Sequence, residues 1–501
     1  MMGYEPKENQ GKLFYYGFHL EKRVSPDHPL RKIAKQIDFD FIYEEVKEHY
    51  GMKGNVSVPP TIILKLMLLL IFYNVRSERE LMATLPVRLD WMWFLGYDLD
   101  DDIPDHSVLS KARARWGVEA FKNFFERIVW QCVQAGLVDG SKLFMDSSLV
   151  QANASNDSVV NRESLKRYLN RSYRELEARL EESPEEEDLP GGPVNRSRIS
   201  TTDPEASVVR QGGKAKLYYK VHRAVDGKNE IITATEVTPG QVNEAQRLSS
   251  LIERHRLNTE KVVETVVADS KYGTVENYLD CFDLGIKAHI PDLKKKQDNT
   301  GSREGIFGEE AFEYDSNTDT YRCPAGQMMK IRRHQKKRKA FEYLCASDVA
   351  AACSLRDQCT RSKTGRSVKR HERQEELNLM RQEAQSKPAQ KDLRIRQYLM
   401  ERTFARATRY GFKQARWRNL WRVLIQEYLT ASLQNILVLI GNVKEQRPVE
   451  AIKIQKVNRK KLLRRLGNCV WGEFFSTIFP NRFLFTYRFC KLCFEQQALK
   501  N

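Results

Sequence analysis

The chain has 501 residues and carries 83 lysines and arginines against 66 acidic residues, a formal charge of +17. This length allows two or three domains, and the basic excess favours nucleic acid as a partner over a ribosome or a membrane surface. The start lacks a signal pattern, and the most apolar run, Ile62 to Phe72, falls short of the roughly 20 residues of a membrane span. We expect a cytoplasmic, nucleoid-associated protein with no membrane partner, whose nine cysteines are free thiols or metal ligands rather than disulfides.

The region from residue 28 to about residue 135 has a helical pattern throughout. Ser77 and Glu80 form the Ser-x-x-Glu pattern that caps a helix start, and Ser107 is expected to cap a later helix. That later helix carries three cations: Lys111, Arg113 and Arg115. A compact helical DNA-binding domain over residues 1–140 is one interpretation, and an all-helical packing or dimerisation domain is the alternative.

From residue 141 the pattern changes to that of an α+β or α/β fold. Short apolar strands are predicted to end at Asp146 and at Asp269, and Asp226-Gly227 predicts a hairpin between two β-rich runs. Further elements are predicted near residues 243–255 (helix), 275–284 (helix) and 287–290 (strand). This order predicts a mixed sheet flanked by helices.

Other segments break this pattern. We expect a charged helix with leucines at positions 165, 169, 176 and 180, and then an acidic loop rich in proline and glycine over 183–193. A helical period returns near residue 393 and runs past 439 with a pause at Gly411. The predicted organisation is a helical domain (1–140), the α/β core (141–291), a basic cysteine-containing insertion (292–394), the rest of the core (395–443) and a basic, aromatic tail (444–501).

Two strands that each end in an aspartate are informative, because open α/β sheets build their sites at the carboxyl ends of strands. Carboxylates suit Mg²⁺ or Mn²⁺, and two such ions about 4 Å apart activate a water or 3′-hydroxyl and stabilise the leaving oxygen in phosphoryl transfer. A third acid is expected from a helix beside the strands, and Glu401 sits on such a helix. Taken singly, each aspartate also fits a turn or cap, and Glu401 a solvated helix position.

Five motifs follow one another along the chain: Met145-Asp146-Ser-Ser-Leu-Val-Gln-Ala-Asn153, Ser200-Thr-Thr-Asp203-Pro-Glu-Ala206, Tyr219-Lys-Val-His222-Arg-Ala-Val-Asp226, Val267-Ala-Asp269-Ser-Lys-Tyr-Gly273, and Glu401-Arg-Thr-Phe-Ala405 with Gly411-Phe-Lys-Gln-Ala-Arg-Trp-Arg418. Together they resemble the DDE transposases of bacterial insertion sequences, in particular the group numbered eleven-eighty-two, which is related to groups four and five. His28-Pro-Leu-Arg31 and Pro104-Asp-His-Ser107 resemble the helical N-terminal domain of these enzymes. The resemblance covers residues 15 to 440.

The resemblance implies a ribonuclease-H-like catalytic core in an enzyme that binds terminal inverted repeats, cleaves DNA strands and transfers them to target DNA by a cut-and-paste route. It assigns the catalytic and metal-binding acids to Asp146, Asp269 and Glu401, with two Mg²⁺ or Mn²⁺ ions, and implies a homo-oligomer on double-stranded DNA. Relatives often carry a lysine or arginine seven residues after the glutamate, where this chain has Thr408. Arg406 or Arg409 would then make that phosphate contact.

A group of four cysteines lies within the predicted insertion: Cys323, Cys345, Cys353 and Cys359. Four thiolates can hold a tetrahedral structural zinc ion. Relatives often have a Cys-x-x-Cys pair whose first position is Ala350 here, so Cys345 would substitute for it. Unligated thiols in a small β-rich insertion are the alternative. The basic run from Lys330 to Lys339 suits contact with DNA, or is a solvated loop.

Basic residues also recur after Glu401, in what the pattern predicts to be one helical segment. The candidate DNA contacts are Arg402, Arg406, Arg409, Lys413, Arg416 and Arg418. Such phosphate contacts are largely independent of base sequence and sensitive to salt, and a solvated basic face is the alternative. Trp417 and Trp421 are expected to pack in the core rather than to stack on a flipped base.

Two other functions remain open at this point. One is an inactive relative that binds DNA through the same helical domain. The other is a metal-dependent nuclease that hydrolyses DNA without joining it. Retention of all three acids favours the transposase over the inactive relative.

Overall fold

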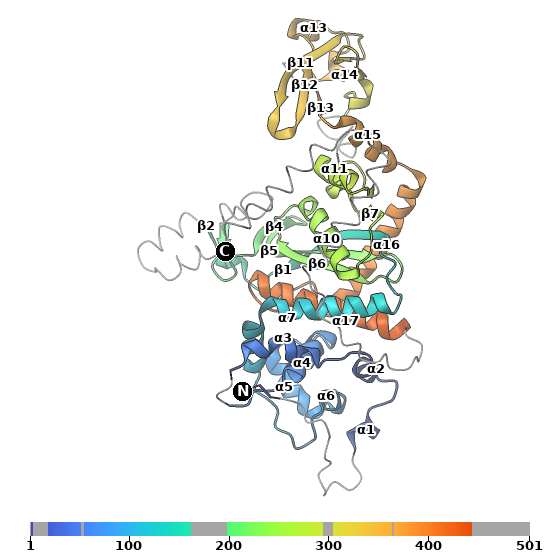
Figure 1. The fold of residues 1–501 in the computed structure, drawn as a ribbon. Helices are drawn as coiled ribbons and strands as arrows, with labels where there is room; N and C mark the ends of the chain where they lie inside the picture. Colours follow the sequence, from blue (N-terminus) through green and yellow to red (C-terminus); the bar gives the residue numbers. More distant parts are fainter. Residues whose placement is uncertain are drawn as a thin grey trace, which may run out of the picture. The chain divides into compact units, whose positions relative to one another are not determined.

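The computed structural model describes residues 2–3, 19–51, 55–161, 198–293, 304–362 and 365–442 (Figure 1). The predicted leucine-containing helix near residues 165–180, the loop over 183–193 and the tail 444–501 lie outside the described residues.

The N-terminal region is helical, as predicted. Its helices are α1 (Leu20–Arg23), α2 (Pro29–Gln36), α3 (Phe41–Val46), α4 (Pro60–Phe72), α5 (Glu78–Thr84), α6 (Leu89–Leu95) and α7 (Ser107–Gln134). The predicted cap of α5 is confirmed, because the Glu80 amide donates to Ser77 Oγ at 3.1 Å. The predicted cap of α7 is wrong. Ser107 is the first helical residue, and its own amide donates to Asp105 Oδ1 at 2.8 Å.

Six strands form one mixed sheet in the order β4-β5-β1-β7-β8, with β6 also paired to β5. They are β1 (Lys142–Gln151), β4 (Ser207–Gln211), β5 (Lys214–Asp226), β6 (Ile232–Pro239), β7 (Thr265–Val267) and β8 (Lys287–His289). Strand β5 is antiparallel to β1, β4 and β6, whereas β1, β7 and β8 are parallel to one another. Helices α10 (Leu248–Thr259) and α11 (Val275–Asp283) make the parallel connections. The predicted mixed α/β arrangement is confirmed.

Successive side chains of a strand point to opposite faces of the sheet, and both faces of this sheet are covered. On β1, Leu143 and Met145 pack in the cluster that contains α10 and α11. Phe144, between them, packs in a second cluster with the N-terminal helices and α17 (Leu420–Asn442). Residues on both sides of the predicted boundary at residue 140 therefore share one core.

Two long helices follow, and the predicted pause at Gly411 lies between them. Helix α16 (Lys387–Thr408) and α17 are separated by residues 409–419. The break occurs where Gly411 adopts φ +77°, and a Cβ there would lie 2.4 Å from Asn74 Oδ1. By length and composition α17 could cross a membrane, but 78% of its apolar window is buried inside the protein. We interpret α17 as a core helix.

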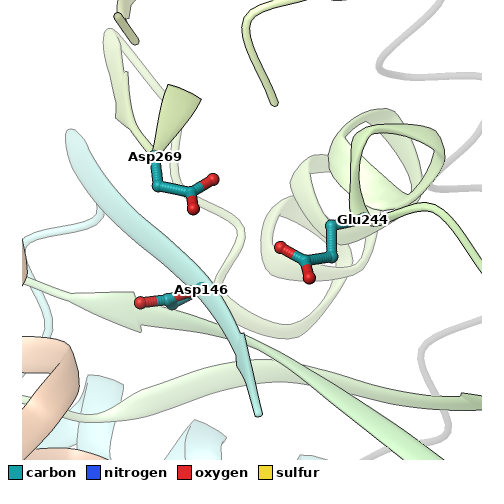
Figure 2. Close-up of side chains that lie close together, drawn as sticks. All are labelled: Asp146, Glu244 and Asp269. Carbon is teal, nitrogen blue, oxygen red and sulfur yellow. The ribbon is translucent and has the colours of Figure 1, made fainter. Parts of the chain in front are cut away.

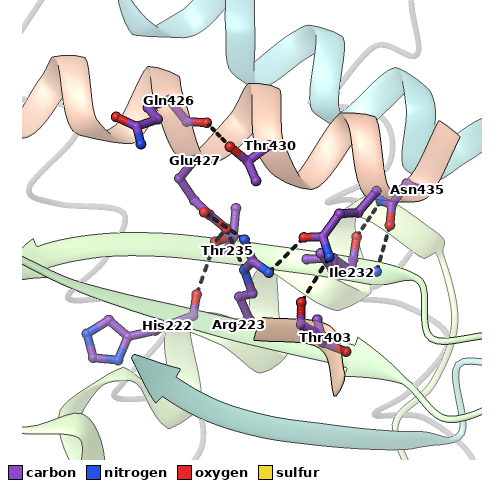
Figure 3. Close-up of polar contacts among 10 residues, drawn as sticks. His222, Arg223, Ile232, Thr235, Thr403, Gln426, Glu427, Thr430 and Asn435 are labelled. Atoms are coloured by element: carbon purple, nitrogen blue, oxygen red, sulfur yellow. Dashed lines mark hydrogen bonds and ion pairs between the residues drawn. The ribbon is translucent and has the colours of Figure 1, made fainter. Parts of the chain in front are cut away.

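A buried ion pair attaches α17 to the sheet (Figure 3). Arg223 of β5 donates from Nε and Nη2 to the two carboxylate oxygens of Glu427, at 2.7 and 2.9 Å. Thr235 of β6 donates to the same carboxylate at 2.8 Å, and Gln434 accepts from Arg223 Nη1 at 2.9 Å. Both charged side chains are at most 1% exposed. The pair is therefore fully desolvated and depends on this geometry.

A second sheet lies within the predicted insertion. It is antiparallel, in the order β13-β12-β11-β10-β9, and is followed by helix α15 (Gln374–Glu383). Its strands are β9 (Glu313–Asp315), β10 (Thr320–Arg322), β11 (Met328–Gln335), β12 (Ala340–Leu344) and β13 (Ser367–His371). Two short helices, α13 (Ser347–Ala351) and α14 (Arg356–Cys359), connect β12 to β13, while β2 (Val159–Asn161) and β3 (Arg198–Ser200) form a separate pair.

Removing one partner of the buried ion pair should destabilise the protein strongly. Glu427→Gln leaves the Arg223 guanidinium buried without a counter-charge, so we expect the free energy of unfolding to fall by about 3–5 kcal/mol. Urea denaturation followed by circular dichroism measures this change. Glu119→Gln, which breaks the exposed pair with Lys122, is the control and should cost less than about 1 kcal/mol. Similar losses in the two variants would contradict this role of the pair.

Candidate metal centre

Two aspartates meet where the parallel strands separate. Val267, the last residue of β7, is the register partner of Phe144 on β1. Asp269 and Asp146 each lie two residues further along, so parallel register brings them side by side. The prediction that β1 ends at Asp146 is wrong, because β1 continues to Gln151 by pairing with β5. The two aspartates nevertheless lie at the carboxyl end of β7, where an α/β sheet can build a site.

A third carboxylate, which the sequence patterns did not predict, joins them. Glu244 begins the 3₁₀ turn η4 (Glu244–Arg247) between β6 and α10. Each of the three acids offers an oxygen, and these oxygens lie within 4.8 Å of one another. Figure 2 shows the three side chains coming from three separate segments. The sequence signal for this turn was Asn243, four residues after β6, whose side chain caps the turn by accepting from the Ala245 amide.

Fixed cations partly balance this negative charge. Arg396 of α16 donates to Asp146 Oδ2 at 2.8 Å, while Lys271 and Lys220 lie 3.0 and 3.2 Å from Glu244 Oε1. Burial raises the pKa of Asp146, and Arg396 only partly opposes that rise. Burial also opposes ionisation of Glu244, but the two lysines outweigh it and hold the pKa of this carboxyl below its ordinary value.

Two buried polar atoms at this group have no protein partner among the described residues. They are Glu244 Oε2 and the hydroxyl of Tyr272. Tyr272 is fully buried, and its pKa lies well above the ordinary value because of burial and then the charges of Glu244, Asp146 and Asp269. Buried polar atoms normally have a hydrogen-bond partner, so unpaired ones indicate that something else belongs beside them. Oxygen atoms from carboxylates form the donor set that Mg²⁺ or Mn²⁺ prefers.

Glu401 lies elsewhere on α16. Its carboxylate is exposed and accepts from Gln397 at 3.3 Å. Arg396 reaches Asp146 from the same helix, but five residues of α-helix turn the side-chain direction by about 140°. The structure therefore brings Asp146 and Asp269 together and leaves Glu401 outside the acidic group.

The candidate DNA contacts divide into three kinds. Arg402 and Arg406 both pair with Glu230 of the β5–β6 loop. Arg416 points inward and donates to the Val75 carbonyl and to Asn74, while Arg418 Nε donates to the Asn153 carbonyl at 3.0 Å. Arg409 and Lys413 are exposed. These residues do not share one helical segment, because α16 ends at Thr408.

The tryptophans predicted for the core pack there. Trp417 and Trp421 lie against the cluster that joins the N-terminal helices to α17. Trp417 Nε1 donates to Glu78 at 3.1 Å, and the Arg113 guanidinium lies 4.0 Å from its ring centre. Arg113 is itself only 4% exposed and pairs with Glu78. It therefore stabilises the packing around Trp417 and does not belong to a basic face.

The four cysteines of the second sheet line one small cavity of about 40 Å³. They come from separate places in that segment: Cys323 after β10, Cys345 after β12, Cys353 between α13 and α14, and Cys359 at the end of α14. All six cysteines in the described part of the chain are free. Among described residues, only the carboxylate group has three or more potential ligand atoms within 4.8 Å of one another. The four cysteines therefore line one cavity, but no three of their sulfurs all lie within 4.8 Å of one another.

Comparison with known protein families gives two matches. A transposase domain model (DUF772) matches residues 18–115, the helical N-terminal region. A transposase DDE domain model matches residues 322–440, which contain Glu401, α16 and α17 but neither Asp146 nor Asp269. No curated protein and no solved structure matched the chain. The matched domains support a DDE transposase, an enzyme with DDE-type transposase chemistry whose partner is DNA and whose family uses divalent metal ions.

Proposed function

We propose that this protein binds the terminal inverted repeats of a mobile element and cuts and joins DNA strands at the Asp146–Asp269 site by a cut-and-paste route. The observation that supports this most is the pairing of the two aspartates at the end of β7. The specific relationship to the insertion sequences numbered eleven-eighty-two belongs to the same proposal. So does a ribonuclease-H-like core, which the antiparallel β5 and β6 beside the parallel β1, β7 and β8 support.

The residues of this site fit a pair of divalent cations. Bound Mg²⁺ or Mn²⁺ supplies the positive charge that activates the attacking oxygen and stabilises the leaving oxygen. Asp146 and Asp269 provide the carboxylates, and Arg396 and Lys271 hold positive charge beside them. Glu401 stays in the proposal as the acid assigned by the resemblance, since it lies within the matched DDE segment.

Loss of either aspartate should abolish cleavage. We expect Asp146→Asn and Asp269→Asn each to remove strand cutting and joining in Mg²⁺, because the amide cannot replace an anionic ligand. DNA affinity should stay nearly unchanged, and the double variant should be no worse than either single one, since the acids act as a unit. The assay is cleavage and strand transfer on DNA that carries the element's ends.

The products of that assay also separate the alternatives. Cut ends without joined products from the wild-type protein would indicate a nuclease. Binding without cutting would indicate an inactive relative. Substantial cutting by either aspartate variant would remove that residue from the site.

We also propose that the exposed cations after α16 bind DNA phosphates. Arg409→Gln with Lys413→Gln should lower the slope of log affinity against log salt by about two, because each phosphate contact contributes about 0.9. Fluorescence anisotropy over a salt series measures this slope. Arg416→Gln is the matched control: its inward-pointing guanidinium predicts lower stability with an unchanged slope. An unchanged slope in the double variant would exclude these two contacts.

A further proposal is that the four-cysteine cavity holds one structural zinc ion, with the sulfurs drawn together to the roughly 4 Å spacing that Zn–S bonds near 2.3 Å require. Purified protein should then contain about one zinc per chain, by mass spectrometry of the metal content. Cys353→Ser should lower that content, whereas Cys132→Ser, in the helical core, should not. Absence of zinc, or equal loss in both variants, would leave unligated thiols as the correct description.

A further inference from the structure

We propose that Glu244 is a ligand of the divalent metal ions, together with Asp146 and Asp269. This inference rests on the proposed function of the site and assigns its third carboxylate. The family resemblance assigns Glu401 as the third acid, so Glu244 and Glu401 are competing candidates for the third carboxylate ligand.

The position of Glu244 follows from the fold around it. Strand β6 ends at Pro239, and η4 begins at Glu244 after a four-residue connection, which brings Glu244 beside Asp146 of β1 and Asp269 after β7. Lys220 of β5 donates to the Val242 carbonyl at 2.9 Å and lies 3.2 Å from Glu244 Oε1. Asn277 of α11 donates to the Ala245 carbonyl at 2.9 Å. Neighbouring elements thus hold this turn on both sides.

The two oxygens of Glu244 have different surroundings. Oε1 faces Lys271 and Lys220, whereas Oε2 is buried and has no hydrogen-bond partner among the described residues. A carboxylate with a side chain only 5% exposed would normally satisfy both oxygens, since an unpaired buried acceptor is costly. An unpaired oxygen within reach of two further carboxylates is what a cation ligand presents.

Tyr272 provides a second, independent observation. It follows Asp269 by three residues in η5 (Ser270–Tyr272), is fully buried, and its hydroxyl has no partner in the described part of the chain. The charges of all three acids act on this hydroxyl. A phenol so placed can donate to a metal-bound water or to a carboxylate that holds a metal. Glu401, by contrast, is exposed, and its carboxylate accepts from Gln397.

Direct metal binding, measured without DNA and without turnover, tests this assignment. We expect Mn²⁺ titration of the full-length protein, followed by electron paramagnetic resonance, to show about 10–100-fold weaker binding for Glu244→Gln, the loss typical of disturbing a metal's ligand environment. Glu244→Asp keeps the charge on a shorter side chain and should retain part of the affinity.

Glu236→Gln separates ligation from folding. Glu236 is also a buried glutamate with two cationic partners, Arg247 and Arg254, but it lies outside the acidic group, so Mn²⁺ binding should match that of the wild type. If Glu236→Gln weakens binding as much as Glu244→Gln does, the effect is structural and the assignment fails. If Glu244→Gln does not fold, Glu244→Asp decides, and wild-type affinity in that variant overturns the assignment.

The outcomes also distinguish this inference from the proposed function. Wild-type Mn²⁺ affinity in Glu244→Gln, with loss in Asp146→Asn, overturns the role of Glu244 and leaves the metal site in place. Loss in Glu401→Gln but not in Glu244→Gln returns the third place to Glu401. Wild-type affinity in Asp146→Asn and Asp269→Asn overturns the metal site itself.

Discussion

Three carboxylates lie close together in this core, and their mutual repulsion has to be offset by the surrounding structure. At separations below 5 Å, each pair of unit charges repels by roughly 3 kcal/mol at an effective dielectric constant near 20. The chain would not hold Asp146, Glu244 and Asp269 together unless the scaffold forced them into place and cations offset their charge. Arg396, Lys271 and Lys220 supply part of that charge. Divalent ions would supply the rest.

The scaffold brings these groups together from segments far apart in the sequence. Parallel register between β1 and β7 sets the two aspartates, and the short connection after β6 sets Glu244. Arg396 depends on α16, which packs against α17, and α17 is attached to β5 by the Arg223–Glu427 pair. The helical N-terminal region shares a core with α17. The region matched by the DUF772 model and the mixed sheet therefore share one hydrophobic core.

Much of this arrangement could be predicted from the sequence, because local patterns carry it. Short apolar runs that each lead to an aspartate indicated β1 and β7 and a site built from the two aspartates. The Ser77 cap was predictable because it depends on contacts within four residues. The extent of β1 was not, since residues 147–151 continue the strand through tertiary pairing with β5. Glu244 was missed for a similar reason, because its approach to Asp146 depends on the tertiary position of η4.

The roles of the basic residues after Glu401 also could not be predicted from the sequence. Their spacing alone suggested one cationic face, but Arg416 satisfies backbone and side-chain acceptors inside the protein, and Arg402 and Arg406 are paired with Glu230. Sequence spacing cannot distinguish a cation used for packing from one left at the surface. Gly411 did indicate that the helical segment is interrupted, because glycine readily adopts the positive φ found there.

Asp146 within β1 and Asp269 just after β7 are proposed to hold divalent metal ions. Crystals of the full chain soaked in Mn²⁺, with diffraction recorded at a wavelength where manganese scatters anomalously, test this proposal directly. We expect anomalous peaks between Asp146, Asp269 and Glu244, with carboxylate oxygens about 2.0–2.3 Å from the ion. Peaks confined to other surfaces, with these three carboxylates unligated at saturating Mn²⁺, would contradict it.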